Sequence, residues 1–272
     1  HSGGDTTVFV QSSNAFDNPA PNLSPEGEAR HIVGDNEFEQ SFVTAPAIVN
    51  SGLGPAFNNT SCAACHPKDG RGEPPEAGGI SNTFFLRLSI PGTDPETGGP
   101  LPVPGFGTQL FDRAIFNVQP EAIVETTYTE IDGNFGDGTP YQLRQPNFTI
   151  ANPYTALPDT YLTSPRVAPP VFGRGLLEAI SDETMLGWAD EDDLDDDGIS
   201  GRVNQVWDIV SETTVIGRFG LKANNPSTLV QTAGAYHGDM GITNELFPLE
   251  STAGQPQDDG SSDDPELRPG VL

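Results

Sequence analysis

The sequence predicts an α+β fold with long loops, and three observations lead to that prediction. Glycine (31) and proline (26) are abundant among the 272 residues and exceed their average usage, so regular elements should be short. Runs of alternating or β-branched residues bounded by Gly and Pro predict strands, most clearly at 84–90 and 122–131. Serines followed by acidic or apolar periodic residues predict helices that begin near residues 24, 181 and 227.

The first part of the chain predicts a lead-in, a helix and a loop. Residues 1–23 are polar and rich in Asn and Pro, so we expect an extended N-terminal segment. Residues 24–28 read Ser-Pro-Glu-Gly-Glu, which places an N-cap, a first-position proline and first-turn acids in order. This helix is expected to end near Gly34, and residues 45–61 to form a loop.

Residues 62–66 read Cys-Ala-Ala-Cys-His, the signature of c-type haem attachment. Cys62 and Cys65 lie three positions apart, so on one helical turn their thiols reach the two vinyl groups of one porphyrin. His66 follows directly and can ligate the iron from the proximal side. The motif uses both cysteines of the chain. The sequence therefore predicts one covalent haem c, with Cys62 and Cys65 as attachment points and His66 as axial ligand to the haem iron.

Other interpretations of this motif fit less well. A thioredoxin-like thiol pair needs a βαβ context, whereas the surrounding residues are rich in Gly and Pro. A zinc site would need a second pair of Cys or His ligands at suitable spacing. A structural disulfide is awkward across two intervening residues and leaves His66 without a role.

The haem motif makes a cytochrome-c-like helical haem core the expected centre of a domain over residues 24–250. A β-rich insertion is expected at about 84–150. Strand 84–90 ends at a Pro-Gly turn, and strand 122–131 is followed by a Gly-rich turn and a strand at 141–144. These predict a hairpin, with a third strand near 147–150.

The second half of the chain alternates loops with short elements. Prolines predict a loop over 152–170, and the next helix starts at Ser181 and carries Met185 and Trp188. Short strands are expected within 203–210 and 214–221, and the helix that opens at Ser227 should end at Gly238. Residues 251–272 are rich in Gly, Ser, Asp and Pro and predict an acidic, flexible tail or linker.

An acidic loop at residues 193–204 predicts a calcium site. Its acids fall at positions 1, 3 and 5 of the loop and a glycine at position 6, as in the first half of an EF-hand loop. The end differs, because an asparagine stands where an EF-hand has a bidentate glutamate. The expected ligands are Asp193, Asp195, Asp197, the carbonyl of Ile199, and Asn204. The alternative is a solvated acidic turn in an acidic chain.

The charge of the chain bounds its partners and location. Asp and Glu number 39 against 12 Lys and Arg, a formal net charge of -27. Nucleic acid and anionic membrane surfaces would repel such a chain. No apolar run is long enough for a transmembrane helix. Covalent haem attachment takes place outside the cytoplasm, so we expect a periplasmic or extracellular protein.

The sixth position of the iron would decide the function, because a second strong ligand favours electron transfer and an open position favours peroxide chemistry. Met240 lies between glycines after a helix, as the methionine ligand of cytochromes c does, and is the first candidate. His237 and His31 are alternatives, and an open site is another. Met185 lies inside an amphipathic helix and is expected in the core.

Beyond the haem motif, ordered matches along residues 14–248 resemble one family. The matching segments are residues 52–58 leading into 61–72, 85–89, 137–141, 164–170, 175–180, 195–204, 217–220 and 238–243. The chain resembles bacterial di-haem oxidoreductases, which are related to di-haem cytochrome-c peroxidases and also labelled thiol oxidoreductases. The resemblance implies two cytochrome domains in series, each with its own Cys-x-x-Cys-His.

This chain departs from that family in containing one such motif and stopping where a second domain is expected. The favoured function is an exported c-type cytochrome module that carries one haem and transfers electrons to a redox partner protein. One alternative is a fragment of a peroxidase-type di-haem oxidoreductase that needs a second haem domain. Another is a subunit of an extracellular multi-haem assembly. No catalytic residue is assigned, and the oligomeric state is open.

Overall fold

The structure is a computed structural model that describes residues 4–79, 81–258, 260, 266–267 and 270–272. Its helices, with two 3-10 turns, are η1 (Gly4–Thr6), α1 (Pro25–Glu39), α2 (Cys62–Cys65), η2 (Pro67–Asp69), α3 (Arg174–Glu178), α4 (Asp182–Gly187) and α5 (Thr228–Met240). Its strands are β1 (Ala56–Phe57), β2 (Phe84–Thr93), β3 (Pro100–Leu101), β4 (Arg113–Ala114), β5 (Ile123–Asn134), β6 (Pro140–Ala151), β7 (Leu162–Val167), β8 (Gln205–Asp208) and β9 (Thr213–Ile216).

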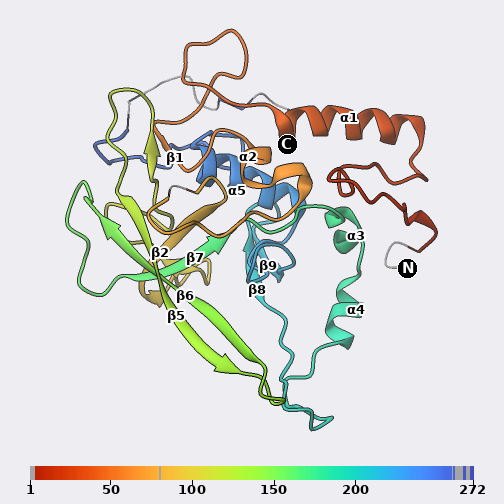
Figure 1. Cartoon of the computed structure of the whole chain (residues 1–272). Coiled ribbons are helices and arrows are strands. Elements are labelled where there is room, and N and C mark those ends of the chain that lie inside the picture. The colour runs from red at the N-terminus through yellow and green to blue at the C-terminus, as the bar shows by residue number, and fades with distance from the viewer. Residues whose placement is uncertain (1–3, 80, 259, 261–265, 268–269) are drawn as a thin grey trace.

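These helices and antiparallel sheets give the predicted α+β class (Figure 1). The sheet orders are β1-β4, β3-β2-β7, β5-β6 and β8-β9. Within the described residues, no helix combines the length and the apolar character that crossing a membrane requires. The cytochrome-c-like character of the helical part stays a prediction.

Serine side chains cap the predicted helix starts. Ser24, Ser181 and Ser227 each accept a hydrogen bond from a backbone N–H three residues on, at the beginning of α1, α4 and α5. The predicted end of α1 near Gly34 is wrong, because the helix continues to Glu39. A helical glycine costs only about 1 kcal/mol, and the added turn places Phe38 with its ring centroid 6.3 Å from that of His66.

Strand β2 separates a core from a cavity by simple alternation. Phe84, Leu86 and Leu88 are buried in a hydrophobic cluster with Val103 and Phe106, while the residues between them are half-buried. The predicted loop over 152–170 is wrong in one part, because β7 forms there and pairs with β2. A strand containing Pro165 is tolerated since β7 lies at the edge of its sheet.

The predicted hairpin is present as β5 and β6, which pair from Ile123–Ala151 to Asn134–Pro140. The separate third strand expected near 147–150 is wrong, because those residues continue β6 without a break. Pro146, opposite Tyr128, is accommodated in a strand whose second edge is unpaired. The hairpin reaches away from α1 and α2 (Figure 1).

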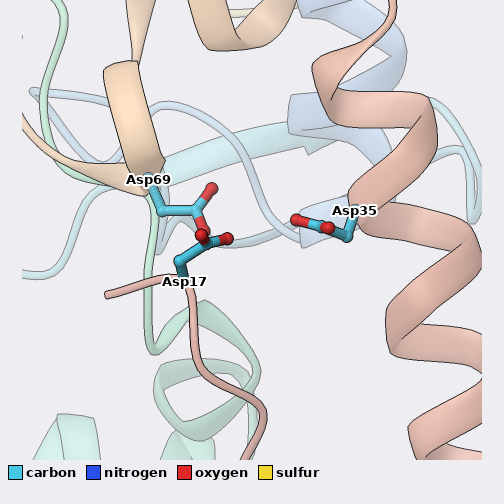
Figure 2. A group of neighbouring side chains, drawn as sticks. All are labelled: Asp17, Asp35 and Asp69. Carbon is cyan, nitrogen blue, oxygen red and sulfur yellow. The ribbon is translucent and has the colours of Figure 1, made fainter. Parts of the chain in front are cut away.

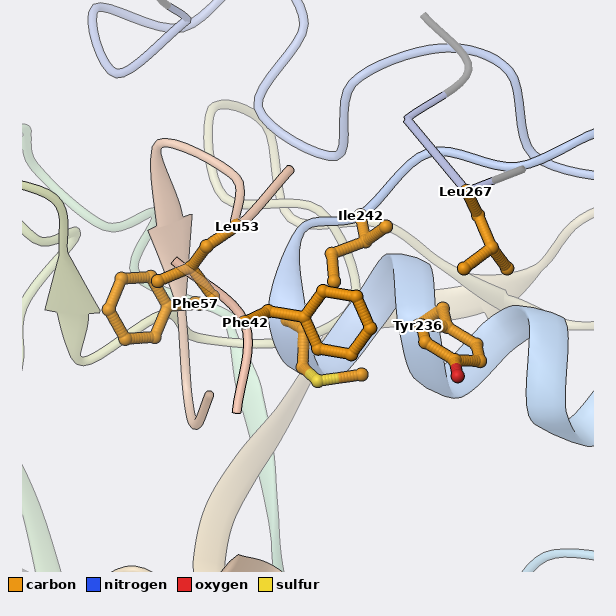
Figure 3. Packing of buried hydrophobic residues seen from close by; sticks show 7 residues of the cluster. Phe42, Leu53, Phe57, Tyr236, Ile242 and Leu267 are labelled. Carbon is orange, nitrogen blue, oxygen red and sulfur yellow. The ribbon is translucent and has the colours of Figure 1, made fainter. Parts of the chain in front are cut away.

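Helix α5 and the segment that precedes α2 share a second hydrophobic cluster, against which Cys62 packs. The members drawn with labels in Figure 3 are Phe42, Leu53, Phe57, Tyr236, Ile242 and Leu267. The expected helix end at Gly238 is wrong. α5 continues to Met240, which is 2% exposed, and ends at Gly241 in the left-handed region (φ 66°).

Within residues 251–272, Leu267 packs in the α5 cluster, and Val271 and Leu272 pack against it. Leu267 is 6% exposed within the α5 cluster, and its N–H donates to the carbonyl of Thr243. The N–H of Thr243 in turn donates to the carboxylate of Glu266 (2.7 Å). Leu267 therefore belongs to the core, and the flexible tail or linker over 251–272 stays a prediction. The domain boundaries themselves stay a prediction.

Glu121 is a fully buried acid beside the β2 cluster. Its carboxylate accepts a hydrogen bond from the N–H of Phe111 (2.8 Å). Burial raises the pKa of Glu121 from 4.5 to about 8, and the contacts with Phe111 and Gln255 lower it by less. The folded protein therefore holds a proton that the unfolded chain releases above pH 4.5.

This proton predicts a stability that depends on pH. Because the folded state binds more protons between pH 4.5 and 8, the free energy of unfolding should fall as pH rises through this window. Urea unfolding at pH 5.5 and 8.5 should show wild type losing on the order of 3 kcal/mol more than Glu121→Gln, which mimics the neutral acid. Equal losses of unfolding free energy in both proteins would contradict a raised pKa of Glu121 in the folded protein.

Candidate functional site

Helix α2 is one turn long and sets the spacing of the two thiols. The hydroxyl of Ser61 accepts from the N–H of Ala64 (3.0 Å) and starts the turn. The N–H of His66 donates to the carbonyl of Cys62 (2.9 Å) and ends it. Cys62 and Cys65 therefore lie on the same turn, as predicted from their spacing.

The imidazole of His66 is held in one tautomer. Its Nδ1 lies 2.6 Å from the carbonyl oxygen of Pro169. Since a carbonyl only accepts, Nδ1 carries the proton, and Nε2 keeps a free lone pair. Burial lowers the pKa of His66, so the ring is neutral near pH 7. A neutral ring with a free Nε2 is the form that ligates a metal.

Pro169 is a functional residue that sequence reasoning missed. It contributes a backbone carbonyl, which has no signature in the sequence, from 103 positions away. The only signal was that residues 164–170 match the resembled family.

The pKa values of the two thiols are raised, whereas thiol–disulfide chemistry needs lowered ones. Both cysteines are free. Burial, helped by the carboxylate of Asp239, raises the pKa of Cys62 to about 12 and that of Cys65 to about 11. Reactive Cys-x-x-Cys pairs instead have a lowered pKa. The pair is therefore unsuited to act as a redox dithiol at neutral pH.

A cavity of about 1640 Å³ opens in front of this motif. Cys62, Cys65 and His66 line it together with parts of α1, β2, β7, α3 and one face of α5. The cavity exceeds the usual volume of a small-molecule pocket, up to about 1,000 Å³. Two thiols and a neutral imidazole on its wall fit a covalently held haem. A smaller hollow of about 460 Å³ at the turn of the β5–β6 hairpin contains neither thiol nor imidazole.

The candidates for the sixth ligand differ in whether they line this cavity. Met240 and His31 both line it. His237 is not among its lining residues in the described part of the chain. Its Nε2 lies 2.9 Å from the carbonyl oxygen of Leu249, and its ring stacks on Phe247. Met185, expected in the core, is half-buried on α4.

The acidic loop brings together part of the predicted calcium set. Carboxylate oxygens of Asp193 and Asp195 lie within 4.8 Å of one another and of Asp190, which was not predicted. Asp197 lies outside this group and accepts from the N–H of Ile199 (2.8 Å). Asn204 donates instead to the carbonyls of residues 222 and 223.

A second acidic group lies beside the cavity and was missed. The carboxylates of Asp17, Asp35 and Asp69 point toward one another from the N-terminal segment, α1 and η2 (Figure 2). Burial, and then the charges of Asp17 and Asp35, raise the pKa of Asp69. Because the three residues come from separate segments, no local sequence pattern predicts that they lie close together.

The fold and this site define an α+β protein that presents two free thiols and a neutral imidazole on the wall of one large cavity. A comparison with protein families matches residues 1–263 to the family described as "Di-haem oxidoreductase, putative peroxidase". The chain belongs to this family, whose name implies haem as the cofactor and confirms the resemblance seen in the sequence. Searches of curated proteins and of solved structures gave no significant match.

Proposed function

We propose that this chain is an exported c-type cytochrome module that carries one covalent haem and transfers electrons. The observation that carries the proposal is the neutral imidazole of His66, fixed by the Pro169 carbonyl, beside two thiols that line the same cavity. Family membership supports a haem-based redox role.

Covalent attachment of the porphyrin to the two cysteines needs no oxidant. Each thiol of Cys62 and Cys65 adds across one vinyl C=C bond of the porphyrin. One C–S bond and one C–H bond would form while the S–H bond and the π bond of the vinyl group break, with no net redox change. The raised pKa of both thiols keeps them protonated and safe from oxidation to a disulfide before attachment.

The remaining residues set the surroundings of the iron. When bound, haem supplies a one-electron Fe(III)/Fe(II) couple. The Pro169 carbonyl holds the Nδ1 proton of His66 and so orients the ring and raises its basicity. Phe38 and Phe85 also line the cavity and make part of its wall apolar. Met240, which is buried on the wall, is the proposed sixth ligand, with His31 as the alternative.

The second candidate function is peroxidase chemistry together with a second haem. The family description favours it, and the sequence contains one Cys-x-x-Cys-His. A second haem domain or a partner chain would therefore have to supply the other haem. For either function we propose a periplasmic or extracellular location, because covalent haem is attached outside the cytoplasm.

The absorption spectra of the oxidised and reduced protein, made in a host that attaches haem c, separate the two functions. One haem per chain, low-spin in both states and with a sulfur-to-iron band when oxidised, would support electron transfer and the Met240 ligand. A high-spin haem that reacts with peroxide would reject that proposal in favour of the second candidate. A protein without haem would reject both.

We also propose that the acidic loop binds calcium as a structural ion. Asp190, Asp193 and Asp195 offer carboxylate oxygens close together, which are the ligands that calcium prefers. The backbone of Asp193 is left-handed (φ 52°), and its carboxylate accepts from the N–H of Gly198 (3.2 Å). These contacts hold the turn in shape for the ion.

Removing calcium should therefore lower the melting temperature. At 100 times its Kd, calcium should stabilise the wild type by about 2.7 kcal/mol, or roughly 5–10 °C. Asp193→Asn should lose this gain in differential scanning calorimetry, and Asp35→Asn, in the other acidic group, should keep it. The reverse pattern would move the site to Asp17, Asp35 and Asp69, and no gain in wild type would reject calcium binding.

A further inference from the structure

Two arginines face the haem cavity from neighbouring strands. In the pairing of β2 with β7, Arg166 lies opposite Phe85, and Arg87 lies opposite Ser164. Arg87 and Arg166 are therefore diagonal neighbours on one face of the sheet. This is the face that lines the cavity, since Leu86 turns to the opposite, buried side.

Within the described residues, neither guanidinium forms an ion pair, although acids outnumber Lys and Arg by 39 to 12. The ion pairs found there join Arg144 to Glu76 and Arg218 to Asp182. Of the cations on the wall of this cavity, Arg87 and Arg166 lie on neighbouring strands, and Arg174 and Lys222 lie elsewhere on the wall; none of the four forms an ion pair among the described residues.

Arg87 and Arg166 also repel each other. Burial, and then the charge of Arg87, lowers the pKa of Arg166. Arg87 attracts the buried Asp239, but that carboxylate already accepts from Gln109 Nε2 (2.9 Å). Like charges at neighbouring positions of a sheet destabilise it unless an anion lies between them. Arg87 and Arg166 therefore offer two neighbouring positive charges to an anionic group in the cavity.

We propose that Arg87 and Arg166 bind the two propionate carboxylates of the porphyrin. The proposal rests on the proposed function, because the same cavity wall holds Cys62, Cys65 and His66. Guanidinium groups bind carboxylates through two parallel N–H···O bonds. The ring of Phe85, with its centroid 5.4 Å from Arg87 Cζ, supports one guanidinium in place.

The test uses holoprotein variants that change charge or geometry: Arg87→Gln, Arg166→Gln, the double variant and Arg87→Lys. Arg144→Gln is the matched control, because Arg144 lies on the β5–β6 hairpin, pairs with Glu76 and does not line the cavity. Haem per chain is measured by the pyridine haemochrome assay. The midpoint potential and the propionate bending bands in resonance Raman spectra report on the contact.

The Gln variants should keep one haem per chain, shift the propionate bands and lower the midpoint potential, most in the double variant. The potential falls because loss of nearby positive charge favours the ferric state. Arg87→Lys should keep most of the potential but shift the bands, since lysine retains the charge without the planar fork.

Unchanged bands and potential in the double variant, with haem present, would overturn the proposal and leave the proposed function intact. A wild type without haem would instead overturn the proposed function and this proposal with it. If added phosphate perturbs the wild-type Soret band saturably, and the double variant abolishes this, the pair binds a soluble anion and the propionate assignment falls.

Discussion

The double variant Cys62→Ser/Cys65→Ser is expected to contain no covalent haem. Serine preserves the size of each side chain, but its hydroxyl does not add across a vinyl group as a thiol does. The serines would occupy the same turn of α2, which Ser61 caps through the N–H of Ala64. Folding should therefore change little while attachment is lost completely.

Three measurements check this result. Intact mass, haem staining of a denaturing gel and the pyridine haemochrome assay after acid–acetone extraction should all show no haem in the double variant. Each single variant should keep one thioether and a shifted haemochrome band. Ala63→Ser, on the same turn, is the matched control and should stay fully loaded. Haem that survives denaturation of the double variant would refute attachment at these cysteines.

Gly54→Ala is expected to be among the most destabilising single substitutions in the chain. Gly54 lies where the segment before α2 crosses the end of α5, and its N–H donates to the carbonyl of Met240 (3.1 Å). A Cβ at this position would lie 2.2 Å from the carbonyl oxygen of Gly241. Backbone atoms on both sides have no rotamer with which to yield, so the two segments must separate.

The expected cost is about 3 kcal/mol or more, a fall of roughly 6–12 °C in melting temperature. Gly234→Ala in α5 is the matched control. Its new Cβ would meet only the Phe247 ring at 3.9 Å, and alanine favours a helix over glycine by up to about 1 kcal/mol. Scanning calorimetry should show the first variant melting well below wild type and the second at or above it. Equal melting temperatures would show that the crossing is not tight.

Features that depend on neighbouring residues were predictable from the sequence. The capping serines at 24, 181 and 227 start helices because a side-chain oxygen and a nearby N–H decide the geometry. The spacing of Cys62 and Cys65 fixes one helical turn in the same way. The β5–β6 hairpin follows from two strands and the turn between them.

Features that depend on residues far apart in the chain could not be predicted from the sequence. Proline at 165 signals a loop, and only the position of β7 at a sheet edge makes a strand possible there. The partner of His66 is a backbone carbonyl at residue 169, which any residue type would supply equally. The burial of Leu267 depends on a hydrophobic cluster built from both halves of the chain.

The long-range hydrogen bonds of the site carry a consequence for the order of folding. His66 meets its carbonyl 103 positions later, and Gln109 meets Asp239 130 positions later. Contacts of such sequence separation form late, because loop closure must precede them. The motif at 62–66, by contrast, consists of five consecutive residues and needs no contact with distant parts of the chain. Under the proposed function, an attachment machinery that recognises only these residues would act on a chain still open, and the cavity would then close around a haem already in place.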